Sequence, residues 1–115
     1  MRILYVEDQR VFAETVATQF LAEHHVAYAA CVAAARETIS GEVGYDAVLV
    51  DYDLPDGKGT EVVRALRAAR FKGLIVAVSG KEDGNAELRA AGAHAICKKT
   101  ELHRIATVLQ RGPAR

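Results

Sequence analysis

Carboxylate, hydroxyl and ammonium side chains follow the apolar runs of this sequence, each at the point where a run ends. They are Glu7 and Asp8, Asp51, Ser79 and Lys99. Three carboxylates brought together repel one another unless a cation neutralises them, and Mg²⁺ prefers oxygen ligands of this kind. A serine hydroxyl and a lysine ammonium beside them could surround the oxygens of a phosphoryl group. The set therefore favours phosphoryl transfer in which an aspartate carries the group.

This chemistry requires elements that bring the five side chains to one place. Apolar runs alternate with segments of helical spacing along the chain, and the runs are apolar throughout rather than on alternate residues; they cover residues 3–6, 24–31, 47–51, 74–78 and 93–97. Such strands are typical of a parallel sheet with both faces covered. With short, right-handed crossovers, the sequence predicts an α/β fold: a doubly wound, five-stranded parallel sheet with helices on both faces. Ligands bind at the carboxyl ends of such strands.

The helical segments carry three further expectations. Residues 10–23 are predicted to form a helix whose apolar stripe, which includes Phe12, faces the core. Residues 81–91 contain Gly84 and few large apolar side chains, which predicts at most a short helix. Thr100 is expected to cap the last helix.

Composition limits the classes of function. A chain of 115 residues, half of them apolar, is predicted to form one domain over residues 1–115. Fifteen basic and fifteen acidic residues cancel, so the charge indicates no direct binding of nucleic acid or of a membrane surface. Cys31 and Cys97 lack metal-ligand spacing, and no apolar stretch approaches a membrane span. We therefore expect a cytoplasmic protein with reduced thiols.

Several motifs resemble those of one family, the receiver domain of two-component response regulators, which has the CheY-like variant of the flavodoxin-like fold. The acidic pair Glu7-Asp8 resembles the acidic pair of that family. The segment Val-Leu-Val-Asp51-Tyr-Asp-Leu-Pro-Asp-Gly-Lys-Gly59 resembles its phosphoacceptor segment. Ser79-Gly80 resembles its switch hydroxyl with the small residue that follows, and Lys99, seven residues after Gly92, resembles its final motif. The resemblance covers essentially the whole chain.

The resemblance implies a signalling role. A histidine kinase or a phosphotransfer protein would donate a phosphoryl group, with Mg²⁺ as cofactor, and a downstream protein target or an output domain outside this chain would respond. The chain would be no enzyme beyond self-catalysed phosphoryl transfer and autodephosphorylation. The implied roles are phosphoacceptor for Asp51, Mg²⁺ ligands for Glu7, Asp8 and Asp51, a backbone carbonyl ligand from Asp53, and phosphoryl contacts from Ser79 and Lys99.

The sequence departs from the family pattern at two positions. Thr100 stands where the family usually has proline, so we expect no cis peptide bond there. Ile96 stands where the family often has an aromatic residue, which argues against signalling by rotation of an aromatic ring. Lys98 competes with Lys99 for the active role. Adjacent residues of a strand point to opposite faces, so only one of them can reach the site.

Three alternatives stay open at the level of sequence. Asp51 could merely cap the turn that follows it. Asp51-Tyr52-Asp53 also resembles the nucleophile motif of haloacid dehalogenase-like small phosphatases, although that motif normally lies on the first strand. The chain could also be a receiver-fold interaction module that is not phosphorylated. Phosphorylation chemistry separates this interaction module from a receiver that accepts a phosphoryl group on Asp51.

Overall fold

The computed structural model of the chain describes residues 1–41 and 44–112. None of the helices in this part of the chain is long and apolar enough to cross a bilayer. The strands of the main sheet alternate with helices, as the apolar pattern predicts. The elements are β1 (Arg2–Val6), α1 (Arg10–Phe20), β2 (His25–Ala29), α2 (Val32–Ser40), β3 (Ala47–Val50), β4 (Asp53–Leu54), β5 (Gly57–Lys58), α3 (Gly59–Ala68), β6 (Leu74–Ala77), α4 (Glu82–Ala91), β7 (Ala95–Ile96), the 3₁₀ helix η1 (Lys99–Arg104) and α5 (Ile105–Arg111).

The main sheet confirms the predicted doubly wound fold. Its five strands are parallel and lie in the order β2-β1-β3-β6-β7, so the chain winds first to one side of β1 and then to the other. The central strands end level with one another, because Val6 lies opposite Val50 and Val50 opposite Ala77. Glu7 and Asp51, the residues that come next, therefore leave the sheet at the same edge.

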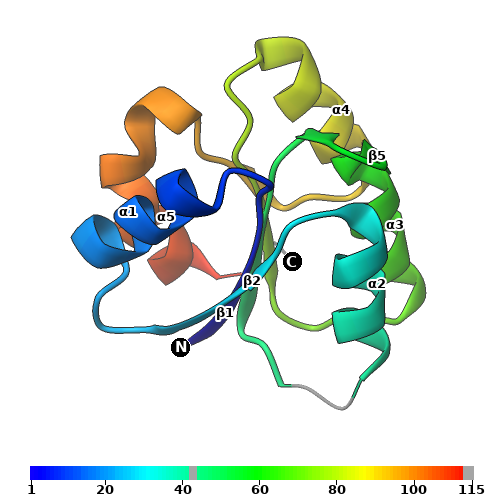
Figure 1. Cartoon of the computed structure of the whole chain (residues 1–115), viewed down its shortest axis with the longest axis horizontal. Coiled ribbons are helices and arrows are strands. Elements are labelled where there is room, and N and C mark those ends of the chain that lie inside the picture. Colours follow the sequence, from blue (N-terminus) through cyan, green and yellow to red (C-terminus); the bar gives the residue numbers. More distant parts are fainter. Residues whose placement is uncertain (42–43, 113–115) are drawn as a thin grey trace.

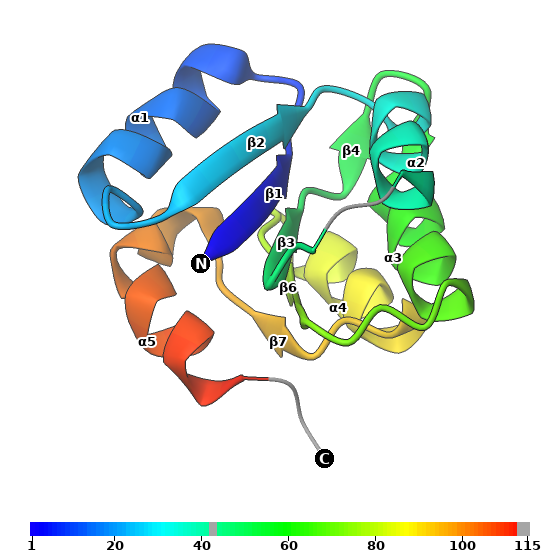
Figure 2. The same ribbon diagram turned by 90° about the horizontal axis from the view of Figure 1, so that it is seen from below.

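Helices cover both faces of the sheet because its central strands are apolar on both sides. Ile3 and Tyr5 of β1 pack in the core on the side of α1 and α5. Leu4 and Val6 point to the opposite side, toward α2, α3 and α4. Figure 1 shows the two helical layers on either side of the strands, and Figure 2 shows the same layers from below. Every residue from Ile3 to Val6 is fully buried.

Helix α4 is longer than the sequence predicts. It has ten residues, as many as α3, although Leu88 is its only large buried side chain. Contacts made by Gly84 and Asn85, which are both buried, replace the missing apolar stripe. Glu82 and the following aspartate also place negative charge in its first turn, where the helix dipole favours it. The expectation of a short helix was wrong because tertiary contacts outweigh weak intrinsic propensity.

The carboxyl-terminal segment also differs from the prediction. Strand β7 is only two residues long, and the chain then enters the 3₁₀ helix η1 before α5 begins at Ile105. Thr100 lies inside η1 and caps no helix, because the residue before η1 is Lys98. The expectation of a Thr100 cap was therefore wrong. The described residues contain no cis peptide bond, as expected from a threonine in place of proline.

Candidate functional site

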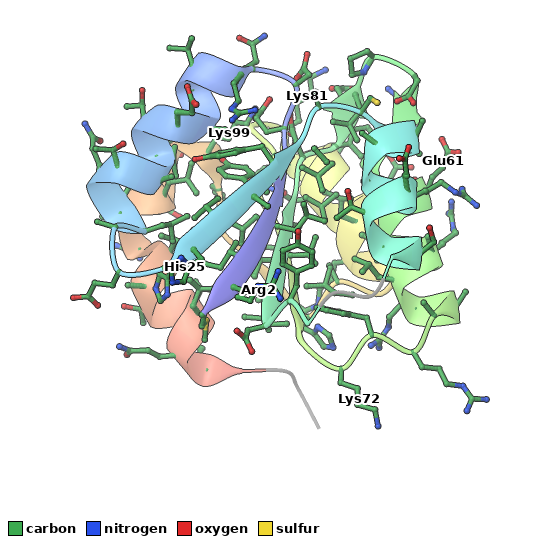
Figure 3. The ribbon with its side chains drawn as sticks, turned by 60° about the horizontal axis from the view of Figure 1, so that its bottom comes forward. Arg2, His25, Glu61, Lys72, Lys81 and Lys99 are labelled. Carbon is green, nitrogen blue, oxygen red and sulfur yellow. The ribbon has the colours of Figure 1, made fainter. Side chains whose placement is uncertain are left out.

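A cleft of about 470 Å³ lies at the carboxyl ends of β1, β3 and β6. Its walls come from four separate parts of the chain, which only the parallel sheet brings together. Figure 3 shows Lys81 and Lys99 at this end of the strands, opposite the end that carries Arg2 and Lys72. The residues lining the cleft are Asp8, Gln9, Phe12, Asp51, Asp53, Ser79, Gly80, Lys81 and Lys99.

Three carboxylates meet at this cleft. Glu7, Asp8 and Asp51 each offer one oxygen, and these oxygens all lie within 4.8 Å of one another. Glu7 is 1% exposed and Asp51 6% exposed, whereas Asp8 is open to solvent. Burial raises the pKa of Glu7, and the nearby Asp51 adds to this, while Lys99 and the Gln9 backbone N–H oppose it. Two carboxylates removed from water beside a third require positive charge.

Lys99 supplies positive charge to the cluster. Its Nζ lies 2.7 Å from Glu7 Oε1, an ion pair without hydrogen-bond geometry, and donates a hydrogen bond of 3.1 Å to Asp51 Oδ2. Burial lowers the pKa of Lys99, but the two carboxylates outweigh burial, so that its pKa is raised. Lys98 instead faces Glu82 at 3.5 Å. The structure thus brings Lys99 into the cleft, and it does so at the start of η1, beyond the strand.

The backbone around Asp51 fixes the direction of its carboxylate. The Asp51 N–H donates to the carbonyl of Val6, which continues the pairing of β3 with β1 by one residue. The Tyr52 N–H then donates to Asp51 Oδ1 at 2.8 Å. One oxygen of Asp51 is thus bonded to the neighbouring main chain, and its second oxygen faces Lys99.

Ser79 also lines the cleft. It is 3% exposed, and its Oγ accepts a hydrogen bond of 3.1 Å from the Lys81 N–H. The Ser79 carbonyl accepts from the Lys99 N–H at 3.4 Å, which ties the ends of β6 and β7 together. Ser79 and Lys99 are thus held by one another's backbone at the cleft.

Asp53 takes a different position from the other acids. It lies in β4, which forms a small antiparallel hairpin with β5 that the sequence pattern did not indicate. Its carboxylate pairs with Lys58 at 2.6 Å and with Lys81 at 3.2 Å, and the hydrogen bonds from Lys58 and then Lys81 lower its pKa. The carboxylate of Asp53 is absent from the three-membered acidic cluster among the described residues. A role for its backbone carbonyl stays a prediction.

Phe12 belongs to the cleft, although its spacing placed it in the core stripe of α1. The side chain is 37% exposed, and the Lys99 ammonium lies 5.2 Å from the centre of its ring. The neighbouring Val11 is 79% exposed. The expectation of a core position for Phe12 was wrong, because the first turn of α1 lies at the level where the sheet ends. Only Ala13, Val16 and Ala17 of α1 are buried.

Comparison with known proteins identifies the family. The model of the response regulator receiver domain matches residues 3–110. The chain belongs to the response regulator receiver family. Receivers are signalling phosphoacceptors rather than classical enzymes. This assignment favours the receiver over the dehalogenase-like phosphatase considered from Asp51-Tyr52-Asp53.

Relatives of known identity agree with this assignment. The chain is 30% identical over 95 residues to the cell cycle transcriptional regulator CtrA of Caulobacter vibrioides, and 29% identical over 92 residues to the cell cycle response regulator CtrA of Brucella ovis. These alignments cover 81% and 80% of this chain but 41% and 40% of the relatives. The chain thus spans less than half the length of these relatives.

Solved structures show the same receiver architecture. The receiver domain of a sensor histidine kinase from Pseudomonas aeruginosa, which has a magnesium ion coordinated in its active site cleft, is 25% identical to this chain. Its TM-score is 0.84, and the match covers 96% of this chain and 94% of that one. A CheY-like receiver domain protein from Methanospirillum hungatei is 24% identical with a TM-score of 0.78, covering 96% of this chain and 94% of the other.

Proposed function

We propose that this receiver accepts a phosphoryl group on Asp51 from a phosphohistidine of a histidine kinase or phosphotransfer protein. The observation that carries the proposal is the buried Asp51 carboxylate, which opens into a cleft and is paired with Lys99 at 3.1 Å. An aspartate that only capped a turn would need neither the cleft nor the lysine. The cytoplasmic location expected from the sequence stays a prediction.

Mg²⁺ is the cofactor that the residues of the cleft fit best. Glu7, Asp8 and Asp51 bring three carboxylates together, and Lys99 offsets only part of their charge. Hard divalent cations prefer such oxygen ligands. The three carboxylates would hold the ion, with the backbone carbonyl of Asp53 as a further ligand. When bound, Mg²⁺ supplies positive charge that offsets the charge of the phosphoryl oxygens.

The chemical step needs little from the protein beyond position and charge. A carboxylate oxygen of Asp51 attacks phosphorus, the P–N bond of the donor phosphohistidine breaks, and the imidazole leaves with the bonding electron pair. The product is an acyl phosphate on Asp51. Lys99 and the Ser79 hydroxyl contact the oxygens of the transferred group, and such preorganised contacts are the main source of rate in phosphoryl transfer. Water later cleaves the acyl phosphate and restores the carboxylate.

The output of the switch is a change in partner binding. A phosphoryl group adds negative charge beside Ser79 and Lys99, so that both can move to pair with it. The responding partner would be a downstream protein or an output domain. The CtrA relatives, one of them named a transcriptional regulator, support an output domain, since this chain matches 41% of that protein.

The experiment that tests the proposal is intact-protein mass spectrometry after incubation with Mg²⁺ and acetyl phosphate. We expect one phosphoryl group on the parent, and none on Asp51→Asn or in the presence of a chelator. Rapid magnesium-dependent release of phosphate from the donor without a stable adduct would indicate fast turnover, and a rapid-quench time course would then reveal the adduct. If there is no adduct and no phosphate release, that result would contradict the proposal and favour an unphosphorylated interaction module.

A further inference from the structure

Helix α4 is hydrogen-bonded to the main chain of Ser79 through one side chain. Asn85 Oδ1 accepts a hydrogen bond of 2.8 Å from the Ser79 N–H, and Asn85 Nδ2 donates one of 2.9 Å to the Ser79 carbonyl. Asn85 is 2% exposed and Ser79 3% exposed, so water cannot replace either bond. The proposed phosphoryl-contacting residue is therefore bound to α4 at both of its backbone polar groups.

A second attachment joins α4 to the residue that follows Asp51. The Tyr52 hydroxyl donates a hydrogen bond to the carboxylate of Glu87, two residues beyond Asn85 along α4. Gly84 packs between the two attachments. A Cβ at Gly84 would lie 2.9 Å from both Ser79 Oγ and Tyr52 Cβ. Helix α4 thus contacts Ser79, which lines the cleft, and Tyr52, which follows Asp51 in the chain.

We propose that Asn85 is the positioning residue through which a displacement of Ser79 reaches α4. The inference rests on the proposed function, because Ser79 responds only if Asp51 receives a phosphoryl group. An amide is suited to this task, since its oxygen accepts and its nitrogen donates, and it can therefore bond to both backbone groups of a single residue. If Ser79 shifts toward the cleft and α4 does not follow, both Asn85 bonds break and the buried Ser79 N–H is left unpaired, while its carbonyl keeps only the longer bond from the Lys99 N–H.

Coupling through Asn85 does not depend on an aromatic ring at position 96. Ile96 lies on the edge strand β7 and is 37% exposed. Its side chain has no polar group that could bond to a residue of the cleft. Asn85 is hydrogen-bonded directly to Ser79, and the aromatic hydroxyl that contacts α4 comes from Tyr52. A surface of α4 would therefore present the phosphorylated state to a partner.

The test is hydrogen exchange of α4 in the full chain, with intact mass measured on the same samples so that phosphoryl occupancy is known. The variants are Asn85→Ala and, as a matched control on an exposed position of the same helix, Arg89→Gln. On addition of Mg²⁺ and acetyl phosphate, exchange of α4 amides in the parent and in Arg89→Gln should change by about fivefold or more, which is the lower end of typical coupling between sites. Asn85→Ala should take up the phosphoryl group but leave α4 exchange unchanged.

Loss of the helix cannot account for that result, because alanine has a higher helix propensity than asparagine. Circular dichroism of Asn85→Ala checks this point. If Asn85→Ala does not fold, Asn85→Asp, which keeps the acceptor for the Ser79 N–H, is the second variant and should weaken the α4 response. A full α4 response in the variant would overturn the role of Asn85. A phosphorylated parent whose α4 does not respond would overturn the inference and leave the proposed function intact, whereas an unphosphorylated parent would overturn both.

Discussion

Two aspartates flank strand β3, and they meet opposite environments. Asp46 precedes the strand and is exposed; its carboxylate accepts from the Arg2 N–H at 2.7 Å, and its backbone pairs with Arg2 and Leu74. Asp51 follows the strand, is buried, and shares one lysine with Glu7. Figure 3 shows these two ends through Arg2 at one and Lys99 at the other.

The difference follows from the direction of the strands. At the amino end, the acceptor groups of Asp46 meet donors from neighbouring strands, so the residue only fastens the sheet. At the carboxyl end, the residues that follow the parallel strands all lie at one edge of the sheet. The acidic groups there outnumber the hydrogen-bond donors that could pair with them. A parallel sheet therefore has one edge that is satisfied and one that attracts ligands.

Exchanging each carboxylate for an amide should give the largest difference between the two ends of β3. Asp51→Asn should lose phosphoryl uptake completely, whereas Asp46→Asn should retain it, as measured by intact mass with Mg²⁺ and acetyl phosphate. In the presence of a chelator, Asp51→Asn should also have a higher free energy of unfolding than the parent, because it relieves repulsion among carboxylates. Equal loss of uptake in both variants would show that the two ends do not differ in chemistry.

The adjacent lysines provide the next test. Lys99→Ala removes the cation that touches Glu7 and Asp51, so phosphoryl uptake should slow by about 100-fold, the usual cost of one preorganised contact. Lys98→Ala should have the parent rate, since Lys98 only faces the exposed Glu82.

A second readout separates electrostatics from misfolding. Without Lys99 the carboxylates lose their fixed partner, so Lys99→Ala should bind Mg²⁺ more tightly than the parent, as measured by calorimetry. Weaker Mg²⁺ binding in this variant would argue against a carboxylate cluster that is short of positive charge.

Two glycines lie against the two aspartates, and each packs on the backbone carbonyl of one of them. A Cβ on Gly59 would lie 1.9 Å from the Asp51 carbonyl oxygen, and a Cβ on Gly73 would lie 2.4 Å from that of Asp46. Both alanine variants should lose about 1–3 kcal/mol of unfolding free energy in urea titrations. Only Gly59→Ala should also slow phosphoryl uptake, since it displaces Asp51. Slow phosphoryl uptake by Gly73→Ala, with an unfolding free energy equal to that of the parent, would contradict this difference between the two glycines.

The sequence was sufficient to predict the residues at the strand ends. Glu7, Asp51, Ser79 and Lys99 each follow an apolar run, and a parallel sheet leaves such residues no place but one edge. The structure brings Lys99 rather than Lys98 into the cleft. The reason is the start of η1 rather than the alternation of a strand, which ends at Ile96.

The residues that the sequence did not reveal depend on how helices dock. Asn85 carries no periodic signal, because its value lies in two bonds to Ser79 that exist only once α4 has packed. Phe12 did carry a periodic signal, which predicted the wrong side. Helical spacing says which residues share a face but not whether the sheet extends far enough to cover that face.

The smallest expected effect concerns pH at the side of the sheet away from the cleft. His94 Nδ1 accepts from the Ile75 N–H at 3.0 Å, so the ring must be neutral at that nitrogen. Burial, followed by the charges of Arg67 and Arg89, lowers the pKa of His94 below its usual 6.5. The unfolded chain therefore binds this proton at a higher pH than the folded chain does. The free energy of unfolding should fall as the pH drops from about 6.5 toward the lowered pKa.

His94→Asn isolates this contribution, because its side-chain oxygen can accept from the Ile75 N–H and does not titrate. The difference in unfolding free energy between parent and variant, measured by urea titration at several pH values, removes the contribution of the other histidines. That difference should change below about pH 7.5 and be nearly constant above it, because one unit above the usual pKa of 6.5 histidine is largely neutral in both the folded and the unfolded chain. A constant difference across the whole range would show that His94 titrates alike in the folded and unfolded chains. Phosphoryl uptake at neutral pH should be the same in both proteins, since His94 does not line the cleft.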